Sequence, residues 1–160
     1  MTSQQTGRLS PSRRTLVKGA AWSVPVVAMA APAHAVGASQ CITWFFGEGS
    51  YKCPGQSTDF AFGYGLTFCV TNTCPTGGPC VTFRIRLDLP VTTNSGAVLV
   101  PRSGSYENPV IEVCPGETEC APILYEFSSD NSASKISFYV EVNGGDPVLV
   151  TTQAPPQGCP

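Results

Sequence analysis

The stretch Phe60-Ala-Phe-Gly-Tyr-Gly-Leu-Thr-Phe-Cys-Val70 decides the fold class of this chain. Aromatic or aliphatic residues fill every even position of the stretch, and small or polar residues fill every odd position. Successive side chains of a β-strand point to opposite faces, so this period of two predicts a strand with one aromatic face buried.

The same alternation recurs along the chain. Residues 81–89 and 136–142 repeat it with a clear apolar face and a polar face. Shorter strands are predicted at 42–46, 97–100, 110–113, 123–127 and 148–152. No stretch after Val36 keeps a helical period for three turns. These patterns predict an all-β domain whose strands form an antiparallel β-sandwich.

Turn residues separate the predicted strands. Pro54-Gly55 and Pro115-Gly116 favour type II turns, because proline fixes φ at the second turn position and glycine accepts a positive φ at the third. Residues 143–146, Asn-Gly-Gly-Asp, predict a hairpin loop. The stretch Pro115-Gly-Glu-Thr118 resembles the turn that often precedes the second strand of immunoglobulin-like domains. This resemblance implies an immunoglobulin-like sandwich.

The first 35 residues have the parts of an export signal. The pair Arg13-Arg14 precedes a weakly apolar run that ends in the small-x-small sequence Ala33-His34-Ala35. This pattern resembles a bacterial twin-arginine (Tat) signal peptide. The resemblance implies recognition by the Tat translocase, cleavage by signal peptidase after Ala35, and a secreted domain of residues 36–160.

The composition of that secreted domain excludes several partners. All eleven acidic residues lie after Ala35, with five of the nine basic ones, so the formal charge of residues 36–160 is −6. A negative, lysine-poor surface repels phosphate groups, which argues against binding to nucleic acid or to lipid headgroups. The apolar part of the leader is shorter than the roughly 20 residues of a spanning helix, so we expect no permanent membrane anchor.

All eight cysteines follow the leader. An even count in a small exported domain predicts four disulfides. Zinc is disfavoured, because only one pair has metal-ligand spacing and the single histidine lies in the leader. Proximity along the chain favours the pairs Cys41–Cys53, Cys69–Cys80, Cys114–Cys120 and Cys74–Cys159.

Candidate catalytic residues are few. Ser129-Asp130-Asn131 and Ser132-Ala-Ser-Lys135 spell two motifs of penicillin-recognising serine enzymes, but they touch each other in a polar loop and no Lys-Thr-Gly follows. Glu117 and Glu119 lie in a turn, where we expect a solvated acidic loop rather than a pair of catalytic carboxyls. We therefore predict no catalysis, no resident metal and no cofactor. Asp130-Asn131 and residues 143–146 leave calcium open.

Other side chains have structural or binding interpretations. Aromatic residues near the start of the mature domain could stack on sugars, but we expect Trp44 or Phe45 to pack between sheets. Phe46 and Tyr51 complete this aromatic group.

Charged residues on the second alternating stretch favour ordinary ion pairs. Arg84 and Arg86 share one strand face, so we expect them to pair with Asp88 or Glu141.

These observations favour a non-catalytic secreted or surface-associated bacterial protein that binds a protein or glycan, or serves as a structural component. Two alternatives remain open. One is a protease inhibitor or toxin-like effector that presents the cysteine-framed loop 74–80. The other is a small secreted hydrolase.

Overall fold

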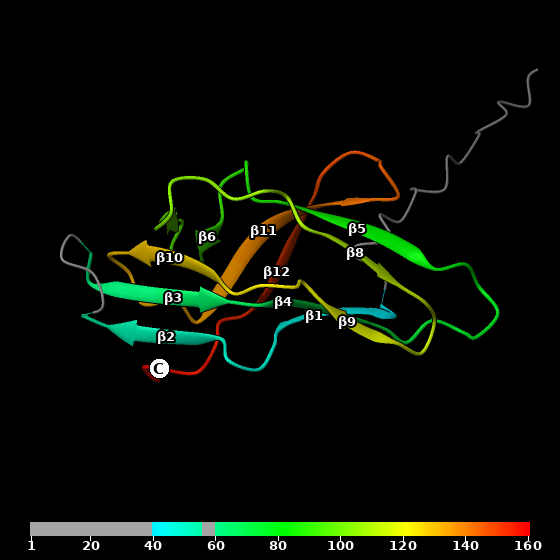
Figure 1. The fold of residues 1–160 in the computed structure, drawn as a ribbon, viewed down its shortest axis with the longest axis horizontal. Helices are drawn as coiled ribbons and strands as arrows, with labels where there is room; N and C mark the ends of the chain where they lie inside the picture. The colour runs from blue at the N-terminus through cyan, green and yellow to red at the C-terminus, as the bar shows by residue number, and fades with distance from the viewer. Residues whose placement is uncertain (1–39, 56–59) are drawn as a thin grey trace, which may run out of the picture. The chain divides into compact units, whose positions relative to one another are not determined.

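The computed structural model describes residues 40–55 and 60–160, which form twelve strands and no helix (Figure 1). Every strand pairing is antiparallel. The predicted leader residues Arg13, Arg14, Ala33 and Ala35 lie outside the described residues.

The strands form three sheets. The first has the order β1 (Ile42–Phe46), β4 (Phe68–Asn72), β9 (Thr118–Cys120). The second has the order β2 (Tyr51–Pro54), β3 (Phe62–Leu66), β10 (Tyr125–Ser129), β7 (Val100–Pro101). The third has the order β12 (Val148–Gln153), β11 (Lys135–Val142), β5 (Val81–Arg86), β8 (Val110–Val113), with β6 (Thr92–Thr93) also paired to β11.

The aromatic stretch 60–70 changes sheets in its middle. It forms two strands, β3 and β4, which are separated by Thr67 and belong to different sheets (Figure 1). The expectation of one strand with a single buried face is therefore wrong. Gly65 is buried on the second face because the Tyr51 ring covers it, and Cys69 is buried there because it is bonded to Cys120. The small residues at positions 63, 65 and 69 thus mark close packing rather than contact with solvent, whereas Ala61 is exposed.

One core joins the sheets. Trp44 of β1 contacts the rings of Phe83 and Phe138 edge-on, with centroid distances of 5.2 and 5.6 Å. Phe68 of β4 packs against Phe138 at 4.9 Å. These contacts hold the first sheet against the third, and the predicted antiparallel β-sandwich arrangement is confirmed. Trp44 packs in the core as expected, whereas Phe45 is exposed.

Four predicted strands match closely, and others differ. Residues 42–46, 110–113, 136–142 and 148–152 correspond to β1, β8, β11 and β12. The predicted strand 81–89 is β5, which ends three residues earlier at Arg86. The predicted strands 97–100 and 123–127 are shifted toward β7 and β10. The alternation does not predict β2, β6 or β9, because each is four residues or fewer and β9 is exposed throughout.

The predicted turns at Pro115-Gly116 and at residues 143–146 are present, whereas the Pro54-Gly55 turn continues outside the described residues. Gly116 has φ 89°, and the Glu117 amide donates to the Cys114 carbonyl at 3.0 Å, which closes the expected Pro115-Gly116 turn. In the β11–β12 loop both Asn143 and Gly144 have positive φ, and the Gly145 amide donates to the Val142 carbonyl.

All eight cysteines form disulfides, so the prediction of four bridges is confirmed. Each predicted pairing is wrong. The bonds are Cys41–Cys74, Cys53–Cys159, Cys69–Cys120 and Cys80–Cys114.

Strand pairing, not proximity along the chain, explains the observed bonds. Cys69 and Cys120 are direct register partners of β4 and β9. Cys80 and Cys114 each lie one residue beyond the paired ends of β5 and β8. Antiparallel pairing of β1 with β4 likewise brings the residues flanking them, 41 and 74, to one end. The fourth bond joins β2 to the C-terminal segment, which runs beside it through a bridge between Lys52 and Gly158 (Figure 1).

Candidate functional site

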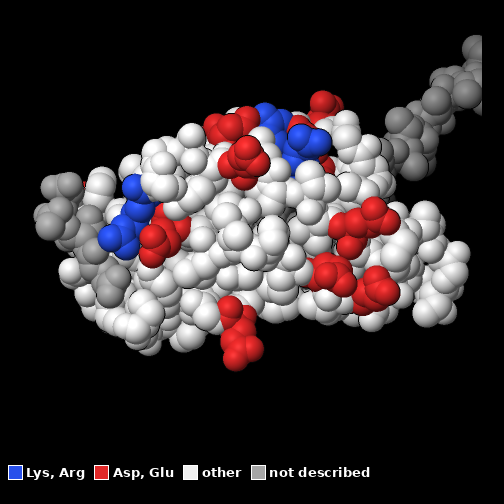
Figure 2. Space-filling model, viewed as in Figure 1, with Lys and Arg blue, Asp and Glu red and all other residues white. Residues whose placement is uncertain are grey.

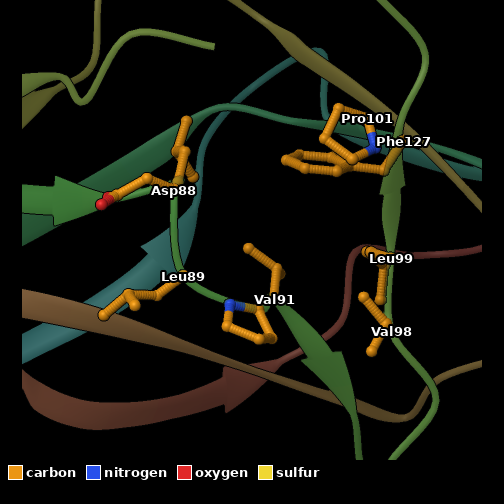
Figure 3. A pocket seen from close by; sticks show the side chains of 9 residues that line it. Asp88, Leu89, Val91, Val98, Leu99, Pro101 and Phe127 are labelled. Atoms are coloured by element: carbon orange, nitrogen blue, oxygen red, sulfur yellow. The ribbon is translucent and has the colours of Figure 1, made fainter. Parts of the chain in front are cut away.

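An apolar pocket of about 230 Å³ opens beside β10 (Figure 3). Its walls come from the segment after β5 and from the segment that leads into β7. The lining residues are Leu87, Asp88, Leu89, Pro90, Val91, Val98, Leu99, Pro101 and Phe127. Eight of these nine side chains are apolar, so the pocket suits an apolar group.

A short hairpin-like turn shapes one wall. The Leu99 amide donates to the Val91 carbonyl at 2.8 Å, and the Thr93 amide donates to the Ala97 carbonyl at 2.8 Å. Val91, Leu99 and Phe127 are buried, whereas Val98 is 50% exposed. The pocket therefore has a fixed floor and an accessible apolar rim.

Asp88 supplies the charge at this site, and its carboxylate is fully engaged. Arg86 binds it with two bonds, Nε to Oδ1 at 2.8 Å and Nη2 to Oδ2 at 2.5 Å. Asn108 Nδ2 donates to the same Oδ1 at 2.8 Å. In Figure 3 the carboxylate points away from Val98, Leu99 and Phe127.

The hydrogen bonds from Arg86 hold the pKa of the Asp88 carboxyl well below its ordinary value. A carboxylate in that state is a weak base at neutral pH, and it holds no proton to donate. Asp88 therefore serves as a fixed charge beside the pocket rather than as a group that transfers protons.

The predicted ion pairs of the β5 face are present. Arg86 also pairs with Glu141 of β11, and Arg84 Nε lies 3.6 Å from the Glu141 carboxylate. Glu141 thus braces β5 against β11 through both arginines.

The loop that carries the two serine-enzyme motifs is held by buried contacts. Tyr64, which is fully buried, donates from its hydroxyl to the Asn131 carbonyl at 2.6 Å and accepts from the Ala133 amide at 2.8 Å. Lys52 Nζ donates to the Ala133 carbonyl at 2.8 Å. Ser129 is buried, and its hydroxyl accepts from the Asn131 amide. These side chains order the loop from residue 129 to residue 134.

The remaining oxygen-rich candidates act as local braces. Glu117 Oε2 accepts from the Cys114 amide at 3.2 Å, and Glu119 is exposed on β9. Asn143 Oδ1 accepts from the Thr82 amide at 2.9 Å, which ties the loop 143–146, left open for calcium, to β5. Among residues 40–55 and 60–160, no three histidine, cysteine or acidic side chains are grouped so as to hold a metal ion.

The predicted cysteine-framed loop is exposed from Pro75 to Pro79. Its two ends are bonded to different partners, Cys74 to Cys41 and Cys80 to Cys114, rather than to each other. The Cys74 amide also donates to Asn72 Oδ1 at 3.0 Å, and Asn72 is buried. The loop is therefore anchored at both ends.

Charge is uneven over the surface. Figure 2 shows a face on which basic side chains lie beside acidic ones, while acidic side chains over β8 and β9 have no basic neighbour. This distribution agrees with the excess of acids in the sequence.

Two comparisons with known proteins, against family models and against curated proteins, gave no match. Within the part of the chain that the structure describes, no helix is long and apolar enough to cross a membrane.

The apolar pocket was not predicted from the sequence. A signal does exist, because the 81–89 alternation ends in Leu87, Leu89 and Pro90 beyond the last strand residue, Arg86. Apolar residues that outlast their strand can line a site, but the partner segment 98–101 is identified only by the fold.

Proposed function

We propose that this chain is a non-catalytic, exported bacterial binding protein whose apolar pocket receives a side chain of a protein partner. The observation that supports the proposal is the pocket itself, with its apolar lining and exposed Val98 rim. Its volume of about 230 Å³ exceeds the roughly 150 Å³ of an engineered cavity that binds benzene, so a leucine or phenylalanine side chain can enter. The few polar groups at the pocket favour a protein side chain over a glycan.

Binding rather than catalysis is favoured by the chemistry of the pocket. The one titratable side chain that lines it, Asp88, is engaged by Arg86 and Asn108 and has a lowered pKa. The hydrogen-bonded turn between Val91 and Leu99, together with the strands around the pocket, favours a preformed site. A preformed site loses little conformational entropy when a partner binds.

An extracellular location is part of the proposal. Four disulfides support an oxidising environment outside the cytoplasm. The twin-arginine resemblance of residues 1–35 supplies the proposed route, through the Tat translocase and signal peptidase. The immunoglobulin-like assignment is likewise a proposal, supported by the Pro115-Gly116 turn that leads into β9.

The route predicts a specific export defect. Replacing Arg13 and Arg14 with lysine should keep the protein inside the cell, because the arginine pair carries the resemblance to a Tat signal. Immunoblots of cell and medium fractions measure this, and N-terminal sequencing of the wild-type exported form should begin at or near Val36. Normal secretion of the double variant would contradict the proposed route.

The pocket proposal is tested by two matched substitutions. Val98 and Val110 are both 50% exposed, but only Val98 lines the pocket. Val98→Asp should reduce binding to isolated cell envelopes of the producing bacterium by about tenfold or more, because it places a charge at an apolar rim. Val110→Asp should bind within about twofold of wild type, and both variants should keep the wild-type melting temperature.

Co-sedimentation with envelopes, before and after protease treatment of the envelopes, measures this binding. Loss of binding after protease treatment identifies a protein partner. Equal binding by the two variants, or binding that survives protease treatment, would contradict the pocket proposal.

A second candidate, a protease inhibitor, is favoured by one observation. The exposed loop 75–79 is anchored at each end by a separate disulfide, as a loop presented to a protease cleft needs to be. Incubation with a panel of proteases tests it: stoichiometric inhibition that is lost when Thr76 and Gly77 are replaced would favour this function over the pocket proposal.

A further inference from the structure

A second hollow, separate from the apolar pocket, is lined by five polar residues and one tryptophan. It has a volume of about 410 Å³ and is formed by β1, β12 and the start of β11. Its lining residues are Thr43, Trp44, Lys135, Thr151, Thr152 and Gln153. None of them lines the apolar pocket, so this hollow carries a proposal of its own.

Strand register builds the hollow. Lys135 pairs with Gln153 across β11 and β12, which places the ammonium and amide side chains at neighbouring positions. Thr152 Oγ1 donates to the Trp44 carbonyl at 2.7 Å and so joins β12 to β1, the strand that brings Thr43. The frame of the hollow is therefore held by backbone pairing and one partly buried hydrogen bond.

Lys135 is the charged group of this lining, and its ammonium makes no hydrogen bond or ion pair within residues 40–55 and 60–160. The other basic side chains of those ranges are engaged: Lys52 with the Ala133 carbonyl, Arg84 and Arg86 with Glu141, and Arg102 with Glu126. No acidic residue lines the hollow. An unengaged cation without an acidic neighbour in the lining favours an anionic ligand group.

The neutral groups narrow the class of ligand. The side chains of Thr43 and Gln153 make no hydrogen bond within the described residues, so both a hydroxyl and an amide are free beside the ammonium. Such groups bind hydroxyls as donors and acceptors. The domain as a whole carries a formal charge of −6 over residues 36–160, which disfavours polyanions but permits a ligand with one negative charge.

We propose that this hollow binds a sugar acid, a ring that carries one carboxylate and several hydroxyl groups. The Lys135 ammonium pairs with the carboxylate, and the side chains of Thr43 and Gln153 bind the ring hydroxyls. Trp44 lines the same hollow and is one of two tryptophans in the chain, the other being Trp22. Its fluorescence therefore reports on occupation of the site.

The experiment uses the full chain with Trp22→Phe, titrated with sodium glucuronate at constant ionic strength. Tryptophan fluorescence should change saturably, and Lys135→Met should weaken the affinity by about tenfold or more, since a charge-assisted bond is lost. Thr43→Val should weaken it by a smaller factor. The control Arg84→Met makes the same change in net charge on β5 and should leave the affinity within about twofold.

Two further ligands test separately whether the carboxylate and the hydroxylated ring are both needed for binding. Acetate has the carboxylate without the ring, and glucose has the ring without the carboxylate, so each should bind at least fivefold more weakly than glucuronate. Acetate binding as tightly as glucuronate would reduce the hollow to a simple anion site and overturn the proposal. Equal binding of glucose, an unaffected Lys135→Met variant, or no saturable signal would overturn it as well. Matching melting temperatures of the variants confirm that folding is intact.

Discussion

Replacing Phe68 with aspartate should leave the domain unable to fold. Phe68 is fully buried, and its ring packs against the rings of Phe46, Tyr125 and Phe138 at 5.5, 5.8 and 4.9 Å. Truncating such a side chain to alanine costs about 3–5 kcal/mol. Burying an unpaired carboxylate adds a further penalty, and the sum is comparable to the whole 5–15 kcal/mol by which domains are stable.

Phe45→Asp is the matched control. It makes the same chemical change on the neighbouring strand, at a side chain that lies outside the core. Phe45 is 38% exposed and lies on β1, the strand paired with β4. We expect its free energy of unfolding to fall by about 1 kcal/mol. Circular dichroism and urea denaturation compare the two variants. Similar stability of Phe68→Asp and Phe45→Asp would mean that the aromatic core is not where the structure places it.

Removing the Cys53–Cys159 bond should cost more stability than removing any other bridge. Its two cysteines are 106 residues apart in the sequence. The separations are 33 for Cys41–Cys74, 51 for Cys69–Cys120 and 34 for Cys80–Cys114. In the chain-entropy model a closed loop of about 100 residues contributes about 4.7 kcal/mol by restricting the unfolded chain. The bond also attaches the C-terminal segment to β2, the edge strand of its sheet.

The test compares Cys53→Ala/Cys159→Ala with Cys41→Ala/Cys74→Ala by urea denaturation. The second pair closes a loop of separation 33, so its loss should cost about 1 kcal/mol less. Peptide mapping of the unreduced wild type should recover the four observed pairs and no free thiol. An equal or smaller loss for the 53–159 pair, or a map with the local pairs predicted from the sequence, would contradict the topology.

The sequence alone was sufficient to predict the strands that have one face in the core and the other face in solvent. Residues 81–86 and 135–142 alternate because one face packs in the core and the other carries charges such as Arg84 and Glu141. Alternation failed where both faces are covered. At Gly65 and Cys69 the covering groups, the Tyr51 ring and the bond to Cys120, come from distant parts of the chain.

Disulfide pairing and the two hollows could not be predicted for the same reason. Each depends on which strands become neighbours in the fold. The alternation of apolar and polar residues within a short stretch carries no information about those neighbours. Cys69 lies eleven residues from Cys80 but is opposite Cys120 in the sheet. Likewise Thr43, Lys135 and Gln153 are unremarkable until β1, β11 and β12 bring them to one hollow.

The bond between Cys53 and Cys159 also sets how the domain responds to mechanical tension. A pull on the two ends of the described region travels from Cys41 along twelve residues to Cys53, and then crosses the sulfur bridge to Cys159. Everything between Cys53 and Cys159 is bypassed by this covalent route. At about 3.5 Å per residue the ends can separate by roughly 40 Å before the backbone is taut. A pull on a tethered molecule would therefore load β1 and its connection to β2 directly, and the end of β4 through the Cys41–Cys74 bond. The strands that follow Cys74 stay outside the shortest covalent route until the Cys53–Cys159 bond is reduced.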